Sequence, residues 1–187
     1  MGAGRAVAVG AHGVYFVSGD HGASWKENNL GQDFHLNKIV AASPTRLYIA
    51  AEGGHLYRSD DAGERWHELS SPYDGSFFGV RPLGGDVVLA YGLRGNLFRS
   101  EDAGATWRNV ETGTHAALND AVKVGTGSLV AAVGLSGVLL VSRDAGKSFL
   151  LVQQEDRKGL SAAMAAGGDE LVVVGEGGAR LIKVAPP

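Results

Sequence analysis

The stretch Ser18-Gly19-Asp20-His21-Gly22-Ala23-Ser24-Trp25 occurs four times along the chain in nearly the same form. The other copies begin at Ser59, Ser100 and Ser142, so that the shared aspartate recurs after 41, 41 and 42 residues. Self-similarity at a period of this length is typical of solenoids, propellers and other repeat arrays. Because the blades of a β-propeller are four-stranded sheets of roughly 40 residues, the sequence predicts an all-β protein of that architecture.

The repeated stretch has the chemistry of a turn. Its Asp side chain can accept hydrogen bonds from backbone N–H groups, its Gly tolerates a left-handed conformation, and its second Ser or Thr can bond back to the Asp. We expect the aromatic residue to be buried between neighbouring blades. The predicted structural residues are Ser18, Asp20, Gly22, Ser24, Trp25, Ser59, Asp61, Gly63, Trp66, Ser100, Asp102, Gly104, Thr106, Trp107, Ser142, Asp144, Gly146, Ser148 and Phe149.

Two copies depart from the pattern. The second carries Arg65 where the others carry Ser or Thr, and the fourth carries Phe149 in place of Trp. Both keep the Asp and the Gly, so we expect both turns to form, with the second the looser. One carboxylate per turn is too few for a calcium site, and four equivalent carboxylates around an array do not form an acid–base pair.

Each repeat also contains an apolar run ending in Gly (Ala51 in the second repeat), a second Gly three residues later, and another apolar run. This pattern predicts a hairpin before the Asp turn. The sequence predicts one propeller domain over residues 1–187, with repeats at about 1–33, 34–75, 76–116, 117–158 and 159–187. The order of strands gives about five four-stranded blades, of which the first and last are incomplete. Two alternatives stay open: five blades that close, or a piece of a larger ring.

Composition excludes several classes of partner. The net charge of −3 carries no basic patch for nucleic acid, and no run approaches the ~20 apolar residues of a membrane span. The absence of cysteine excludes disulfides and thiolate metal sites. The six histidines share no metal-ligand spacing, so no metal and no cofactor are expected. The N-terminus lacks the pattern of a signal peptide, and the composition leaves the localisation open.

The four turns resemble the Asp-box, or bacterial neuraminidase repeat, of sialidases, sortilin-type receptors and photosystem II stability/assembly factor-like proteins. The segments Ala6–Gly13 and Tyr91–Ser100 are most similar to the last group. That resemblance implies a β-propeller that binds a protein partner, in a family of mostly longer, secreted or periplasmic members, with this chain matching the C-terminal part.

The resemblance does not extend to a sialidase active site. Arg58 and Arg99 share a repeat position just before the turn Ser, where they cannot converge on a substrate, and no Arg-Ile-Pro motif is present. We therefore expect a protein that is not an enzyme and has no catalytic residues.

A ligand or partner face is expected opposite the Asp turns, where the hairpins and the loops between blades surround the mouth of the channel. The candidate residues there are His12, Asn37, Glu52, Tyr73, Phe78, Arg94, Asn119, Asp120, Ser161 and Glu176. Asn37, Phe78, Asn119 and Ser161 fall at one repeat position on the first strand. The alternative for this set is a water-filled channel with hydrated polar walls.

Three functional hypotheses follow. The first is a non-enzymatic scaffold or assembly factor that grips a protein partner on one face. The second is a carbohydrate-binding or glycosidase-like propeller, which needs two carboxylates within reach of each other, and only Glu52, Glu176 and Asp120 are candidates. The third is a homo-oligomer in which another copy completes the propeller.

Overall fold

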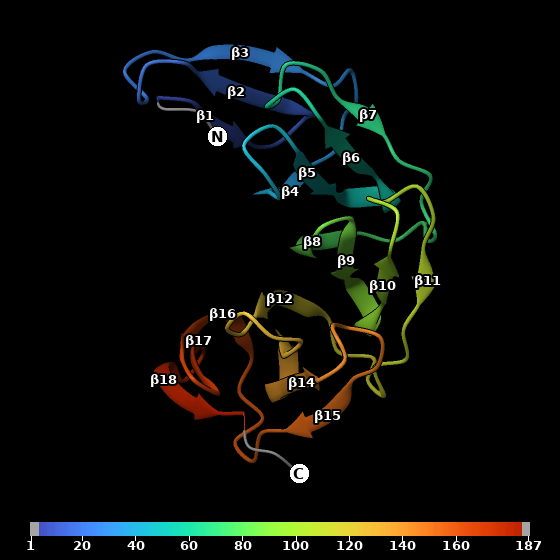
Figure 1. Ribbon diagram of the computed structural model, residues 1–187, viewed down its shortest axis with the longest axis vertical. Helices are drawn as coiled ribbons and strands as arrows, with labels where there is room; N and C mark the ends of the chain where they lie inside the picture. Colours follow the sequence, from blue (N-terminus) through green and yellow to red (C-terminus); the bar gives the residue numbers. More distant parts are fainter. Residues whose placement is uncertain (1–3, 185–187) are drawn as a thin grey trace. The chain divides into compact units, whose positions relative to one another are not determined.

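Residues 4–184 are described by a computed structural model, and they form five antiparallel sheets in chain order (Figure 1). The first sheet has three strands, in the order β1-β2-β3. Its strands are β1 (Ala6–Val9), β2 (Val14–Ser18) and β3 (Lys26–Asn29). The fifth sheet also has three strands, β16 (Leu160–Gly167), β17 (Glu170–Gly175) and β18 (Gly178–Lys183), in the order β16-β17-β18.

The three middle sheets have four strands each, and each runs in sequence order from first strand to fourth. The second sheet comprises β4 (Leu36–Ala41), β5 (Leu47–Ala51), β6 (Leu56–Ser59) and β7 (His67–Glu68). The third comprises β8 (Phe77–Gly84), β9 (Val87–Gly92), β10 (Leu97–Ser100) and β11 (Arg108–Asn109). The fourth comprises β12 (Leu118–Lys123), β13 (Val130–Gly134), β14 (Val138–Ser142) and β15 (Leu150–Gln153).

Three short 3-10 helices close the hairpins between the second and third strands of the middle sheets. They are η1 (Glu52–Gly54), η2 (Leu93–Gly95) and η3 (Leu135–Gly137). Each contains a central residue with positive φ: Gly53, Arg94 and Ser136 at 63°, 59° and 57°. Within the described residues, no helix has the length and apolar character that a membrane crossing requires.

The second strands β5, β9 and β13 of the middle sheets are apolar and almost entirely buried on both sides. Strands β5 and β13 are buried along their whole length. The outermost strands β7 and β11 are exposed and only two residues long. This gradient, from buried second and third strands to an exposed fourth strand, agrees with the predicted blades.

Contacts divide the chain into two compact units, 1–88 with 100–107 and 89–99 with 108–187. The core of the first unit joins the first and second sheets through Tyr15, Ile49 and Tyr57. The core of the second unit joins the fourth and fifth sheets through residues such as Leu139 and Leu171. The predicted all-β class and five sheets are confirmed, and within residues 4–184 the first and fifth sheets have three strands where the middle sheets have four, as predicted.

Candidate functional site

The Asp turns connect the third and fourth strands of a blade, and we call this edge of the blade the Asp-turn end. In the first turn, the Ser18 Oγ donates to Asp20 Oδ1 at 2.8 Å and accepts from the Gly22 N–H at 2.8 Å. The Ser24 N–H donates to Asp20 Oδ1 at 2.9 Å and its hydroxyl to Oδ2 at 2.6 Å. The carboxylate is therefore fully engaged in holding its own turn.

The third and fourth turns repeat this pattern bond for bond. In the second turn the Arg65 N–H still donates to Asp61 at 2.9 Å, but the hydroxyl bond is missing because Arg65 has none to give. The predicted turn chemistry is thus present at all four sites.

These hydrogen bonds lower the pKa of the turn carboxyls. Bonds from the Ser24 hydroxyl and N–H lower the pKa of Asp20 to about 2, and those from Thr106 do the same for Asp102. Burial opposes the shift at Asp144, yet the bonds from Ser148 still lower its pKa to about 2. The pKa of Asp61 is also lowered, chiefly by the N–H of Arg65. All four carboxyls are poor proton donors or acceptors near neutral pH.

The second, third and fourth turns also link neighbouring sheets, through the carbonyl of the residue that precedes their Gly. The carbonyl of Ala103 accepts from Arg58 Nη1 at 3.1 Å and from the Tyr48 hydroxyl at 3.2 Å, and both donors lie in the preceding sheet. The Ala145 carbonyl accepts from Arg99 Nε at 2.9 Å in the same way. The two arginines that share a repeat position thus join one sheet to the next Asp turn, a role that sequence reasoning missed.

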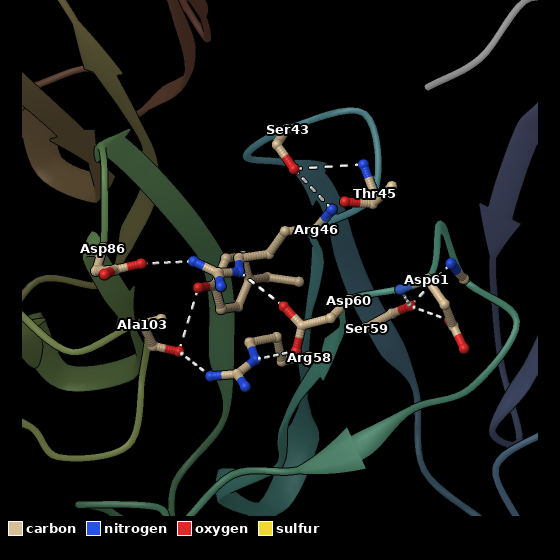
Figure 2. Close-up of polar contacts among 11 residues, drawn as sticks. Ser43, Thr45, Arg46, Arg58, Ser59, Asp60, Asp61, Asp86 and Ala103 are labelled. Carbon is tan, nitrogen blue, oxygen red and sulfur yellow. Dashed lines mark hydrogen bonds and ion pairs between the residues drawn. The ribbon is translucent and has the colours of Figure 1, made fainter.

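Figure 2 shows how charge gathers around one of these links. Arg46 donates from Nε to Asp60 at 2.8 Å and from Nη1 to Asp86 at 2.6 Å, and Arg58 Nε donates to the other oxygen of Asp60 at 2.8 Å. The hydrogen bonds that Arg46 donates to Asp60 and Asp86 raise the pKa of Arg46. Burial acts to raise the pKa of Asp60, but the hydrogen bonds from Arg46 and Arg58 outweigh it and lower that pKa. The cluster is a set of satisfied pairs at the Asp-turn end.

The aromatic residues of the turns are less buried than predicted. Trp66, Trp107 and Phe149 are half-buried, and Trp25 is 46% exposed. Trp66 packs edge-on against Tyr15 of the preceding sheet, with ring centroids 6.1 Å apart. The aromatic side chain therefore leans onto the sheet before it, and Trp25 is exposed because its sheet is the first one described.

The opposite edge of each blade, which we call the hairpin end, carries the candidate ligand or partner residues. Its backbone is closely packed: a Cβ on Gly54 would lie 2.2 Å from the Tyr73 carbonyl, and one on Gly95 would lie 2.2 Å from that of Thr114. Both glycines have positive φ, at 83° and 73°. The second Gly of the repeat is thus required where the loop to the next sheet crosses the hairpin.

Two of the candidate carboxylates serve this packing. Glu52 accepts from the His35 N–H at 3.0 Å, and Glu176 accepts from the Gly159 N–H at 2.9 Å. The third, Asp120, is buried and accepts from the Tyr91 hydroxyl at 3.3 Å and the Ala163 N–H at 3.1 Å. Each carboxylate is therefore bound to backbone of its own unit.

The polar residues expected to line the channel are partly used in the same way. Asn37 donates to the Phe77 carbonyl and Asn119 to the Leu160 carbonyl, both at 2.8 Å. Each Asn sits at a register shift between the first and second strands, which turns its amide toward the first strand of the next sheet. Ser161 lies at the equivalent shift of the fifth sheet and is exposed.

The remaining candidates do not converge on one site. His12 Nδ1 lies 2.5 Å from Asp33 on the surface of the first sheet, Arg94 is exposed on η2, and Phe78 is half-buried. Tyr73 lines a shallow hollow of about 380 Å³ together with His55 and Glu68. Between residues 4 and 184, no three His, Asp or Glu side chains are grouped so that they could hold a metal ion.

The most exposed apolar residues of the hairpin end were not singled out from the sequence. Leu93 is 37% exposed and Leu135 is 47% exposed, and they occupy the same position of η2 and η3. The signal was available, because the repeat places Ala11, Glu52, Leu93, Leu135 and Glu176 at one turn position where a large apolar side chain has no core to enter.

Solved structures of known proteins share this arrangement of sheets. YCF48 bound to D1 peptide matches with a TM-score of 0.69 and 14% identity, covering 96% of this chain and 64% of that chain. YCF48 from Cyanidioschyzon merolae matches with a TM-score of 0.72 and 15% identity over 98% and 64%. The GH74 xyloglucanase from Xanthomonas campestris matches with a TM-score of 0.72 and 15% identity over 94% and 34%.

The fold is a β-propeller. At these identities the likeness establishes the fold alone. The chain spans about 64% of the length of the YCF48 chains that it matches. No protein-family model matches the sequence, and comparison with curated proteins gives no significant match.

Proposed function

We propose that this propeller is a non-enzymatic scaffold that binds a protein partner through its hairpin ends. The observation that carries the proposal is the pair Leu93 and Leu135, two large apolar side chains that project from equivalent rigid hairpins into solvent. Exposed apolar side chains on ordered loops are typical of protein–protein contact sites.

Side-chain hydrogen bonds fix the two hairpins that carry Leu93 and Leu135. The Thr112 hydroxyl donates to the Gly95 carbonyl at 2.9 Å, and the Gln153 amide donates to the Ser136 carbonyl at 2.6 Å. A side chain presented on a preorganised loop loses little conformational entropy when it binds, which favours recognition. The exposed Arg94 adds a guanidinium beside Leu93, which suits a partner with an acidic or carbonyl-rich contact.

One structural neighbour supports a peptide or protein ligand, since it is described as YCF48 bound to D1 peptide. The carbohydrate alternative is less well supported. A retaining glycosidase needs two carboxyl groups about 5 Å apart and free to act. In this chain each of the three candidate carboxylates, Glu52, Glu176 and Asp120, already accepts a hydrogen bond from a backbone N–H. This arrangement favours a structural role for them over a catalytic one.

The test is site-specific photo-crosslinking in cells, with a photoreactive residue at position 93, at 135, or at Lys147 as a matched exposed control on the Asp-turn end. We expect one discrete protein adduct from positions 93 and 135 and none from 147. The adduct partner is then purified, and the double variant Leu93→Asp/Leu135→Asp should weaken its affinity by about tenfold or more.

Three results would contradict the proposal. Adducts that form equally from both ends would remove the role of the hairpins, and an affinity unchanged by the double variant would remove the role of the leucines. Saturable binding of xyloglucan oligosaccharides, measured by calorimetry, would instead favour the carbohydrate-binding alternative.

A further inference from the structure

The outer edge of the fourth sheet, on the side of its fourth strand, differs from the outer edges of the first three sheets. Strand β3 begins with Lys26 and Glu27, and strands β7 and β11 are two residues long and contain Glu68 and Arg108. Short strands and charged side chains protect an edge from pairing with another chain. Strand β15 has neither protection, because it extends over the four residues Leu150–Gln153 and none of them is charged.

The exposure of Leu150 belongs to its position at the outer edge. The strand registers place His67 and Arg108 at the position of Leu150 in the second and third sheets. Both are exposed, although the Asp turn of the next sheet lies beside Arg108, whose Nη2 donates to the Lys147 carbonyl at 3.3 Å. In the fourth sheet this exposed position holds a leucine, which is 56% exposed.

The backbone of β15 is open along the same edge. Within residues 4–184 the strand pairs only with β14, and the Gln154 N–H that follows it donates inward to the Gly137 carbonyl at 2.9 Å. Backbone groups of alternate residues point to opposite sides of a strand, so those of Leu151 and Gln153 point outward. In the described part of the chain no strand lies on that side. The edge can therefore accept a further strand through main-chain hydrogen bonds.

The two flanks of β15 carry opposite charges. Lys147 precedes the strand and Glu155 follows it; both are exposed, and neither side chain forms an ion pair with another described residue. In an antiparallel pair of identical strands centred on Leu151, residues equally far on either side of Leu151 lie opposite each other. Lys147 of each strand then lies opposite Glu155 of the other, and Leu150 lies opposite Val152. The edge is therefore complementary to itself in charge and in apolar character.

We propose that β15 pairs antiparallel with β15 of a second copy, about a two-fold axis at Leu151, so that two fourth sheets form one continuous sheet. Leu150 and Val152, which are 56% and 37% exposed, then pack against each other across the axis, and Lys147 pairs with Glu155. This charge complementarity favours a second copy over an unrelated strand. The contact is isologous, because the same surface meets itself, and it is independent of the hairpin ends.

The first test is the molar mass of the chain by light scattering across a wide concentration series. We expect the mass to rise from 19.4 kDa toward twice that value as concentration increases. Lys147→Glu and Glu155→Lys should each weaken the association about threefold to thirtyfold, because each places like charges opposite each other. The double variant Lys147→Glu/Glu155→Lys restores opposite charges and should recover the dissociation constant of the original chain.

The second test is a disulfide across the axis. The chain has no cysteine, so Leu151→Cys introduces a single thiol. The Cα atoms of a hydrogen-bonded antiparallel pair lie about 5.5 Å apart, a separation that a disulfide spans. Under mild oxidation we expect a covalent dimer on a non-reducing gel. Asn109→Cys is the matched control, since Asn109 is exposed at the same position of β11 and should remain monomeric. Circular dichroism verifies that all variants fold.

A mass of 19.4 kDa at every concentration would overturn the proposal. So would a dimer that both single charge variants leave intact, because another surface would then be responsible. A double variant that associates no better than the single variants would exclude the antiparallel two-fold pairing. Equal yields of covalent dimer from Leu151→Cys and Asn109→Cys would show that the thiols meet by random collision.

Discussion

The two ends of each blade share a backbone repeat but differ in how far their side chains repeat. At the Asp-turn ends, the same serine, aspartate and hydroxyl bonds recur from turn to turn, with one hydroxyl missing in the second. At the hairpin ends, the conformation of η1, η2 and η3 is shared, while the tip residue changes from Glu52 to Leu93 to Leu135. The residues at the Asp-turn ends therefore stabilise the fold, whereas the tip residue at the hairpin ends differs from blade to blade.

The largest loss of stability is expected from a substitution at Gly95, where close packing fixes the hairpin backbone. Gly95→Ala would place a Cβ 2.2 Å from the Thr114 carbonyl at a φ of 73°, so we expect a loss of roughly 3 kcal/mol or more in the free energy of unfolding. Gly125→Ala is the control, since its φ is 64° but no atom lies within 4 Å of the new Cβ. It should cost about 1 kcal/mol in urea unfolding. Equal costs would remove close packing as the cause.

The next effect lies at the Asp-turn end. Ser100 is buried, and its Oγ accepts from the Gly104 N–H while donating to Asp102. Ser100→Ala leaves that N–H without a partner, which should lower the free energy of unfolding by about 1–3 kcal/mol. Ser43→Ala removes an exposed hydroxyl that also accepts backbone N–H bonds, and it should cost less. Chemical denaturation of both variants compares the two directly.

Low pH should destabilise the fold by protonating the carboxylates of the Asp turns. Asp20, Asp102 and Asp144 have a pKa of about 2 in the folded chain against an ordinary value of 3.8. A lowered folded pKa adds stability that is complete above the unfolded pKa and is lost as pH falls through the folded one. We therefore expect the free energy of unfolding to fall from about pH 4 to pH 2. Carboxyl NMR titration would contradict this if the three groups titrated near pH 4.

The smallest change in stability is expected from restoring the missing hydroxyl of the second Asp turn. Arg65→Thr restores the hydroxyl that the second turn lacks and should stabilise the chain by a few tenths to about 1 kcal/mol. Thr106→Arg makes the reverse change in the third turn, where the hydroxyl donates to Asp102 at 2.6 Å. The two melting temperatures should shift in opposite directions. A shift of the same sign in both would show that the hydroxyl is not responsible.

The sequence predicts interactions between residues that are close along the chain, and it does not predict those between residues far apart. The turn bonds of Asp20 span four residues, and the hairpins span three, so local residue types determine both. The link from Arg58 to Ala103 spans 45 residues, and the bond from Asn119 to Leu160 spans 41. These partners meet only after two sheets have packed, and a repeat pattern does not say which side chains meet across the joint.

The same difference in range explains two features of side-chain placement that the sequence did not predict. Trp66 and Trp107 were expected to be buried between neighbouring blades, but they are half-buried, because an aromatic residue that leans on the preceding sheet at its outer edge keeps one side in solvent. Asn37 and Asn119 were expected to point toward a channel, and the sequence did not predict that each, at a register shift, donates to the first strand of the next sheet. In both cases the type of element was predicted correctly, and the direction of the side chain was set by the neighbouring sheet.

The links between sheets have a consequence for how such a chain can evolve. Each donor lies in one repeat and its acceptor in the next, as for Arg58 with Ala103 and Arg99 with Ala145. A gene duplication or deletion of one whole repeat would supply or remove a donor and an acceptor together, leaving no partner stranded. The number of blades can therefore change in single steps without any redesign of the joints, while the residue at each hairpin tip diverges independently.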